Sequence, residues 1–210
     1  MPVEPARKRA VTFIDGQNLF HCAKEAFGYS HPNYDPLKIS QCIANNNGWT
    51  LKQARFYTGY PSVSVDQMWG EYWQRRLLAI SRQGVKHFAR ELRSRRKTVR
   101  LDNGELHETT VLEEKGIDVR IAIDVIRLAL DDEYDVAVIF SQDQDLSEAA
   151  SEIRKISKRQ NRWIKVVSAF PIGSGTLNNR GINGTDWMPI DKAEYDRCLD
   201  LRDYRRQKQD

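Results

Sequence analysis

Short apolar runs that stop abruptly at polar residues alternate along this chain with longer segments of helical periodicity. Residues 11–14 (VTFI) stop at Asp15, and residues 136–140 (VAVIF) stop at Ser141. Runs this short and this apolar are typical of strands that are buried on both faces of a sheet. We therefore expect two central strands, each followed directly by an acidic loop.

Helices are predicted between these strands and two further ones. Asp35 followed by Pro36 is typical of a helix start, because aspartate caps the free N–H groups and proline fits the first helical position. That helix should run to about residue 44. Helices are also expected near residues 19–27, 65–81, 117–130 and 146–158, and strands near residues 51–58 and 163–170.

Alternation of strands and helices predicts one α/β domain of three layers, Rossmann-like, with a mainly parallel central sheet. We place this domain at residues 10–190, after an N-terminal arm at residues 1–9 and before a C-terminal helix at residues 191–210. Tryptophans at helical spacing within residues 65–81 are expected to pack in the core.

An Asn103-Gly104 pair predicts a tight hairpin turn, with the hairpin covering about residues 87–112. Basic residues are concentrated on its first strand, so the hairpin should form a protruding basic β-ribbon. A second basic run follows the acidic motifs, from Arg154 to Lys165. The net charge of +4 is too small to identify a polyanionic partner, but this distribution favours one.

Composition excludes several classes of protein. With 210 residues, 40% hydrophobic and 30% charged, the chain is typical of a soluble globular protein. Its apolar runs are far shorter than the roughly 20 residues that cross a bilayer. Three widely spaced cysteines indicate neither a disulfide framework nor a zinc site. We expect a cytoplasmic protein with no membrane partner.

Acidic residues follow both central strands. Because ligands bind beyond the carboxyl ends of parallel strands, Asp15 should lie close to Asp143 and Asp145. Crowded carboxylates raise one another's pKa unless a cation offsets their charge. Oxygen ligands without histidine or cysteine suit Mg²⁺ or Mn²⁺. The sequence therefore predicts a divalent-metal site.

Two further side chains are expected at this site. Asn18 lies one helical turn after Asp15 and can orient a phosphate or a water. Asp118 lies in the first turn of the helix at residues 117–130, where a carboxylate is also a common helix cap. Asp124 on the same helix is rotated by roughly 120° from Asp118 at ~100° per residue, so we expect it to make a structural hydrogen bond instead.

Together, the motifs FIDGQN, KGID and SQDQDL resemble the NYN family of PIN-like ribonucleases. The aspartates of these motifs match Asp15, Asp118, Asp143 and Asp145, and the asparagine matches Asn18. The resemblance covers roughly residues 10–187 and implies a PIN-like fold and metal-assisted hydrolysis of RNA. The family usually has glycines where this chain has Gln142 and Gln144, a change that narrows backbone freedom and adds bulk near the metal.

The resulting hypothesis is a metal-dependent endonuclease in which Asp15, Asp118 and Asp143 hold one ion. Asp145 would act as an outer ligand or would support a second ion recruited with the substrate, and Ser141 and Asp124 would support the site. Contacts to the nucleic acid are assigned to Arg93, Arg95, Arg96, Lys97, Arg100, Lys155 and Lys158, because phosphate contacts supply most nucleic-acid affinity. Tyr57 and Tyr60 are candidates for stacking on bases, with core packing as the alternative.

Other functions remain open on the sequence. A non-catalytic RNA-binding or scaffold protein could keep the same fold. A haloacid-dehalogenase-like phosphatase also begins with a strand-end aspartate, but it needs an acid where this chain has Gln17. Dinucleotide binding is disfavoured because GxGxxG does not follow the first strand. The sequence leaves open the RNA target and whether the protein is a homo-oligomer.

Overall fold

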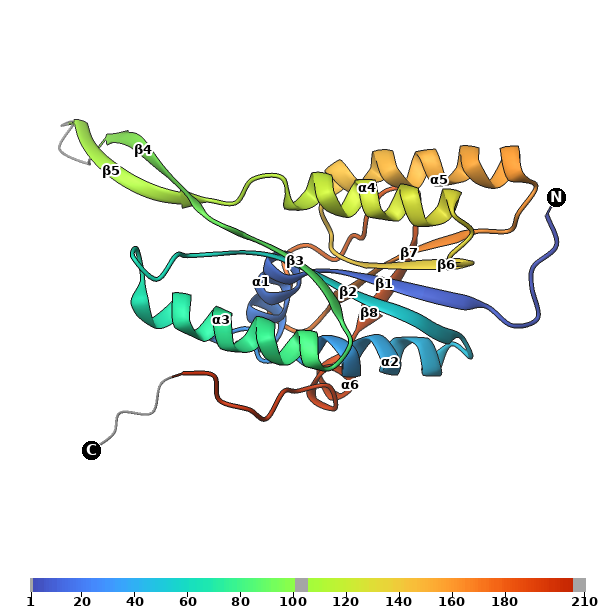
Figure 1. Ribbon diagram of the computed structural model, residues 1–210, viewed down its shortest axis with the longest axis horizontal. Helices are drawn as coiled ribbons and strands as arrows, with labels where there is room; N and C mark the ends of the chain where they lie inside the picture. Colours follow the sequence, from blue (N-terminus) through green and yellow to red (C-terminus); the bar gives the residue numbers. More distant parts are fainter. Residues whose placement is uncertain (1, 101–105, 206–210) are drawn as a thin grey trace.

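Six parallel strands form the central sheet of the protein, whose computed structural model describes residues 2–100 and 106–205 (Figure 1). In spatial order the strands are β3 (Lys86–Glu91), β2 (Thr50–Tyr60), β1 (Arg9–Asp15), β6 (Val136–Phe140), β7 (Lys165–Pro171) and β8 (Asp186–Ile190). Every neighbouring pair is parallel. The predicted α/β class with a mainly parallel sheet is confirmed.

Helices cover both faces of this sheet, as Figure 1 shows. One layer consists of α4 (Ile117–Leu130) and α5 (Ser147–Gln160). The other layer contains α1 (Gly16–Phe27), α2 (Pro36–Asn46), α3 (Gln67–Arg82) and the short α6 (Lys192–Asp196). In the described ranges, no helix is both long enough and apolar enough to cross a membrane.

Strand β1 has an apolar core on each side, which explains its uninterrupted apolar run. Val11 and Phe13 pack with α4 and α5, whereas Ala10 and Ile14 pack with the helices of the opposite layer. Because alternate side chains of a strand point to opposite faces, both faces of β1 must be apolar.

Strand order reverses at β1, and this reversal fixes the position of a ligand site. From β1 the chain builds β2 and β3 on one side, then returns to build β6, β7 and β8 on the other. Connections therefore leave the carboxyl ends of β1 and β6 in opposite directions, which opens a crevice between the two ends. Asp15 is the last residue of β1, and the SQDQD motif follows β6.

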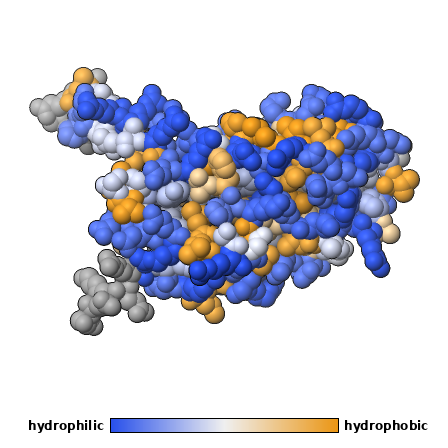
Figure 2. Space-filling view, viewed as in Figure 1, coloured by the Kyte–Doolittle hydropathy of each residue, from blue (hydrophilic) through white to orange (hydrophobic). Residues whose placement is uncertain are grey.

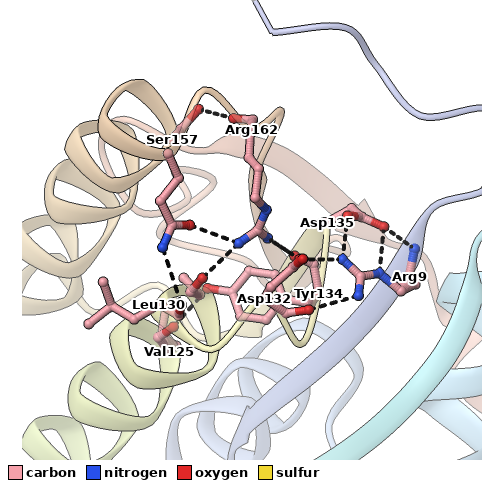
Figure 3. A network of polar contacts seen from close by, with 10 residues as sticks. Arg9, Val125, Leu130, Asp132, Tyr134, Asp135, Ser157 and Arg162 are labelled. Atoms are coloured by element: carbon pink, nitrogen blue, oxygen red, sulfur yellow. Dashed lines mark hydrogen bonds and ion pairs between the residues drawn. The ribbon is translucent and has the colours of Figure 1, made fainter.

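At the other edge of the sheet, a network of charged residues holds the starts of β1 and β6 together (Figure 3). The Arg9 guanidinium donates to Asp135 at 2.9 Å and to Asp132 at 2.6 Å. Arg162 also contacts Asp132, at 3.0 Å, and donates to the backbone oxygen of Tyr134 at 2.8 Å. Asp132 and Asp135 therefore each have a basic partner.

An antiparallel ribbon of β4 (Arg93–Arg100) and β5 (Leu106–Glu113) projects beyond the sheet on the side where β1 ends (Figure 1). The protruding ribbon was predicted, but its predicted start at residue 87 is wrong. Residues 86–91 form β3 and pair with β2, because the half-buried Phe88 and Ala89 pack on the core. The Asn103-Gly104 turn lies outside the described residues.

The C-terminal segment also differs from the prediction. Within the described part of the expected helix at residues 191–210, only the five residues of α6 are helical and residues 197–205 are not. Residues 206–210 lie outside the described residues. Tyr195, Cys198 and Tyr204 are all buried against the core, and their spacing does not follow a single helical face. A strand that was not predicted, β8, follows the turn-rich loop after β7.

Candidate active site

Asp15 ends β1 and also caps α1, so its position is fixed from two sides. Its carboxylate accepts the backbone N–H of Asn18 at 3.0 Å and the Ser141 hydroxyl at 3.4 Å. The next residue must be small, because a Cβ on Gly16 would lie 2.7 Å from the Phe56 ring and 2.9 Å from the Tyr57 carbonyl oxygen. The Asp-Gly step thus lets the chain turn sharply against β2.

Asp143 and Asp145 lie in the loop after β6. Asp143 accepts the Asp145 N–H at 3.0 Å and caps a short 3₁₀ turn, η1 (Gln144–Leu146), which buried Leu146 anchors. The Asp143 N–H donates to the Ser141 hydroxyl at 3.1 Å. The Ser141 hydroxyl therefore links the Asp15 carboxylate to the Asp143 backbone N–H. Asp145 is exposed at the rim.

The Asn18 side chain links α1 to the same loop. Its amide oxygen accepts the Gln142 N–H at 3.0 Å. That oxygen is thus engaged by the protein, so in this structure Asn18 positions the β6 loop against Asp15. The sequence predicts that Asn18 contacts a phosphate or a water. Because the amide oxygen is engaged, this contact is assigned to the amide nitrogen and stays a prediction.

A fourth carboxylate, Glu114, joins the site although the sequence reading did not single it out. It lies between β5 and α4, and it accepts the backbone N–H of Gly59 at the end of β2. Burial and the negative charges of Asp15 and Asp118 raise the pKa of Glu114 to about 7, against the Gly59 hydrogen bond, which lowers it. Glu114 lies four residues before Asp118, just ahead of the start of α4. This spacing is the sequence signal that could have identified it.

Asp118 reaches the cluster from the first turn of α4. The helix begins after Gly116, whose φ of 75° lies in the left-handed region that favours glycine. Asp118 is half-buried and lies close enough to Glu114 to affect its pKa. The structure therefore brings both Asp118 and Asp15 near Glu114.

Burial and neighbouring negative charge both act on this cluster. Burial, and to a smaller extent the charge of Asp143, raise the pKa of Asp15 to about 6, against hydrogen bonds from Asn18, Ser141 and Gln17 that lower it. Among the ion pairs of the described residues, none includes Asp15, Glu114, Asp118 or Asp143. The acids at this edge thus lack the basic partners that those at the other edge have.

Such a donor set fits a hard divalent cation. All of its oxygens come from carboxylates, which Mg²⁺ and Mn²⁺ accept, and a cation would stabilise the ionised form of Asp15, whose pKa is raised by burial and by the charge of Asp143. Within residues 2–100 and 106–205, no three acidic, histidine or cysteine side chains are close enough together to enclose an ion. This agrees with the habit of Mg²⁺ to take one or two carboxylates and to fill its remaining positions with water or substrate oxygens.

Asp124 points away from the cluster, toward β2. It is fully buried and accepts from Arg55 at 2.7 Å and from the Tyr57 hydroxyl at 2.9 Å. Burial would raise the pKa of Asp124, but the Tyr57 hydrogen bond and the Arg55 charge lower it overall. Its expected hydrogen bond to a neighbouring strand is present. Tyr57 is itself buried, which contradicts a stacking role for its ring, while Tyr60 is half-buried.

The two glutamines of the SQDQD motif attach a loop to the site. Gln142 donates to the backbone oxygens of Asn178 and Arg180 at 2.8 and 2.9 Å. Gln144 donates to the Gly181 oxygen at 3.1 Å and accepts the Asn183 N–H at 3.1 Å. The loop between β7 and β8 is therefore held against the β6 loop.

Basic candidates fall in two different places. Those on β4, Arg93, Arg95, Arg96 and Lys97, are exposed on the ribbon, and Arg95 faces Glu113 at 3.5 Å. The Arg100 side chain lies outside the described part. Lys155 and Lys158 are on α5, which starts beside Asp145, so at 1.5 Å per residue they lie roughly 12 and 16 Å along the helix from its start.

Comparison with known proteins decides the family. The model of the family described as NYN domain matches residues 9–171, a span that contains the whole acidic cluster. The chain belongs to the NYN domain family. As a family, NYN domains are PIN-like nucleases and typically depend on a divalent metal. No curated protein matches this NYN domain in sequence.

Solved structures add support for the fold alone. A crystal structure of a protein of unknown function from Vibrio parahaemolyticus is 21% identical, with a TM-score of 0.53, and the match covers 92% of this chain and 98% of that one. A deacetylase in a complex with teicoplanin is 14% identical over 75% of this chain and 68% of that one. Its TM-score of 0.31 is too low to indicate a shared fold.

Stability of this NYN domain should depend on pH through Asp15. An acid whose pKa is higher in the folded state destabilises the fold above its unfolded pKa of about 3.9, and fully so above about 6. The shift of about two units corresponds to about 3 kcal/mol. Asp15→Asn should therefore raise the free energy of unfolding of the metal-free protein at pH 8 by up to that amount, and by little at pH 4.

Urea denaturation in EDTA at both pH values measures this difference. Asp131→Asn, at an exposed residue after α4, is the control and should change stability at neither pH. Loss of stability in Asp15→Asn at pH 8 would contradict the prediction.

Asp124→Ala should lower the free energy of unfolding by about 3–5 kcal/mol, because it leaves the buried Arg55 guanidinium without its carboxylate. Below its melting temperature the variant should keep the wild-type affinity for Mn²⁺, since Asp124 does not face the cluster. Thermal denaturation and metal titration measure the two effects separately. A fully stable variant that no longer binds metal would show the opposite role.

Replacing both Gln142 and Gln144 by alanine should release the loop at residues 178–183, because four hydrogen bonds of roughly 1 kcal/mol each are lost. We expect amide hydrogen exchange in this loop to become at least about tenfold faster. Gln160→Ala, at the far end of α5, serves as the matched control. Unchanged exchange in the double variant would refute the attachment.

Proposed function

We propose that this NYN domain is a metal-dependent endonuclease that hydrolyses phosphodiester bonds in RNA. The observation that supports it most strongly is the group of crowded carboxylates without basic partners at the carboxyl ends of β1 and β6. Family membership supports nuclease activity, and the resemblance of the motifs supports RNA as the substrate.

Asp15, Asp118 and Asp143 would hold Mg²⁺ or Mn²⁺, one or two of them directly and the rest through bound water. Bound there, the ion would supply activation of water and neutralise charge on the scissile phosphate. Glu114, whose pKa is about 7, is half ionised near neutral pH and would bind or release a proton beside the reacting phosphate. Asp145, exposed next to Asp143, would support the outer side of the site, and Ser141 would keep Asp15 and Asp143 in place.

Basic side chains on the ribbon would bind the rest of the substrate. The ribbon surface is mostly hydrophilic (Figure 2), and four exposed cations lie on β4. Phosphate contacts of this kind are sequence-independent and weaken as salt rises. Lys155 and Lys158 would contact a longer substrate, because they lie farther along α5. We propose that the enzyme is soluble and acts in the cytoplasm. Its oligomeric state is left open.

A non-catalytic RNA-binding protein is the second candidate function. The side-chain attachment of the β7–β8 loop by Gln142 and Gln144 favours it, since those residues fill space where the family usually has glycine. The retention of every acid favours the nuclease.

Incubating the protein with total RNA and with single-stranded DNA, with and without Mn²⁺, tests the proposal. We expect Mn²⁺-dependent cleavage of RNA, and a loss of roughly a hundredfold or more in Asp143→Asn, because the charge that holds the metal is removed. Asp131→Asn should cleave like the wild type. Cleavage that continues in EDTA, or in Asp143→Asn at the wild-type rate, would refute a metal-dependent mechanism, and RNA binding without cleavage would favour the second candidate.

A further inference from the structure

A cavity of about 320 Å³ lies beside the acidic cluster, between α1, the start of α3 and the base of the ribbon. Gly16, Gln17 and Phe20 of α1 line one side, Trp69 and Trp73 of α3 another, and Leu112 of β5 a third. Its volume is at the lower end of the roughly 300–1,000 Å³ typical of small-ligand sites. It is therefore large enough for one planar ring system.

The cavity shares two of its walls with the acidic cluster. Gly16 and Gln17 follow Asp15 directly, and consecutive Cα atoms are about 3.8 Å apart. On the ribbon side, Leu112 precedes Glu114 by two residues. A nucleic-acid strand with one phosphate at Asp15 would therefore have an adjacent nucleotide at the mouth of this cavity.

Aromatic rings give the cavity its chemistry. Phe20 and Trp69 are half-buried, so each ring packs on the core and keeps a part open, whereas Trp73 is buried. The sequence prediction that the tryptophans pack in the core is therefore fulfilled by Trp73 and only in part by Trp69. Open aromatic faces next to apolar side chains bind flat, weakly hydrated rings.

Polar groups stand at the edge of the same cavity. His21 is exposed, and Asp66 uses one carboxylate oxygen to cap α3 through the Trp69 N–H at 3.0 Å. A few polar groups around an apolar pocket fix the orientation of a ligand that carries hydrogen-bonding edges. A nucleobase has both the flat ring and such edges.

We propose that this cavity binds one unstacked nucleobase of the substrate strand, adjacent to the phosphate at the acidic cluster. The inference rests on the proposed function and makes the substrate single-stranded at this position, because a base within a duplex cannot enter. The ribbon, which contributes Leu112 to the cavity wall, would hold the phosphates on one side while Phe20 and Trp69 hold the base on the other.

The test compares a fluorescent oligouridylate with an oligonucleotide of the same length that lacks bases, by anisotropy in EDTA. Wild-type protein should bind the oligouridylate more tightly. Phe20→Leu, which keeps an apolar side chain but removes the ring, should weaken binding of the oligouridylate by roughly five- to a hundredfold and leave binding of the abasic strand unchanged. Trp69→Leu should act in the same direction.

Met68→Leu is the matched control, since Met68 is the exposed neighbour of Trp69 on α3 and is not part of the cavity wall. Circular dichroism and thermal denaturation establish that each variant is folded. Equal wild-type affinity for the two strands, or Phe20→Leu and Trp69→Leu that bind the oligouridylate like the wild type, would overturn the proposal.

Because the assay contains no metal, it separates this inference from the proposed function. A base-dependent affinity that is lost in Phe20→Leu, in a protein that does not cleave RNA, would support the cavity and refute the nuclease. Metal-dependent cleavage by a protein that binds the two strands with equal affinity would support the nuclease and refute the cavity.

Discussion

The site depends on the placement of buried, closely spaced carboxylates, without basic partners in the described residues, at the carboxyl ends of β1 and β6. The fold creates it, because the reversal of strand order at β1 brings Asp15 and the β6 loop to the same crevice. Ser141 and Asn18 then hold the two strand ends in contact through hydrogen bonds to Asp15 and Gln142. The protein thus maintains a cluster of carboxylates whose negative charge a bound cation would offset.

The two edges of the sheet show how selective this arrangement is. At the start of β1 and β6, Asp132 and Asp135 are close to Arg9 and Arg162, and the pKa of Asp135 is lowered overall despite its burial. At the other edge burial and neighbouring charge raise the pKa of Asp15. The same residue type therefore stabilises the fold at one edge and forms the proposed active site at the other.

Much of this could be predicted from local patterns. Apolar runs that end at Asp15 and Ser141 predicted the central strands. The aspartates that follow these strands predicted an acidic cluster at the strand ends. Glu114 was missed because its role depends on the ribbon leading back to β2, a contact between distant segments. The β3 strand was assigned to the hairpin because its alternation continues into β4, and only packing of Phe88 and Ala89 on the core separates the two.

Features particular to this chain surround the shared acids. Gln142 and Gln144 attach the β7–β8 loop, which supplies a fixed wall where glycines would leave a more open loop. On the other side, the ribbon and the aromatic cavity would extend the site along the proposed nucleic-acid strand. The acids would set the chemistry, whereas these two additions would set what can reach it.

Calorimetric titration with Mn²⁺ tests the central claim most directly. A metal site at the acidic cluster predicts binding by the wild type, an affinity at least about tenfold weaker in Asp15→Asn, and wild-type affinity in Asp131→Asn, whose charge lies at the opposite edge of the sheet. Equal Mn²⁺ affinity in Asp15→Asn and the wild type, or no binding by the wild type, would contradict it.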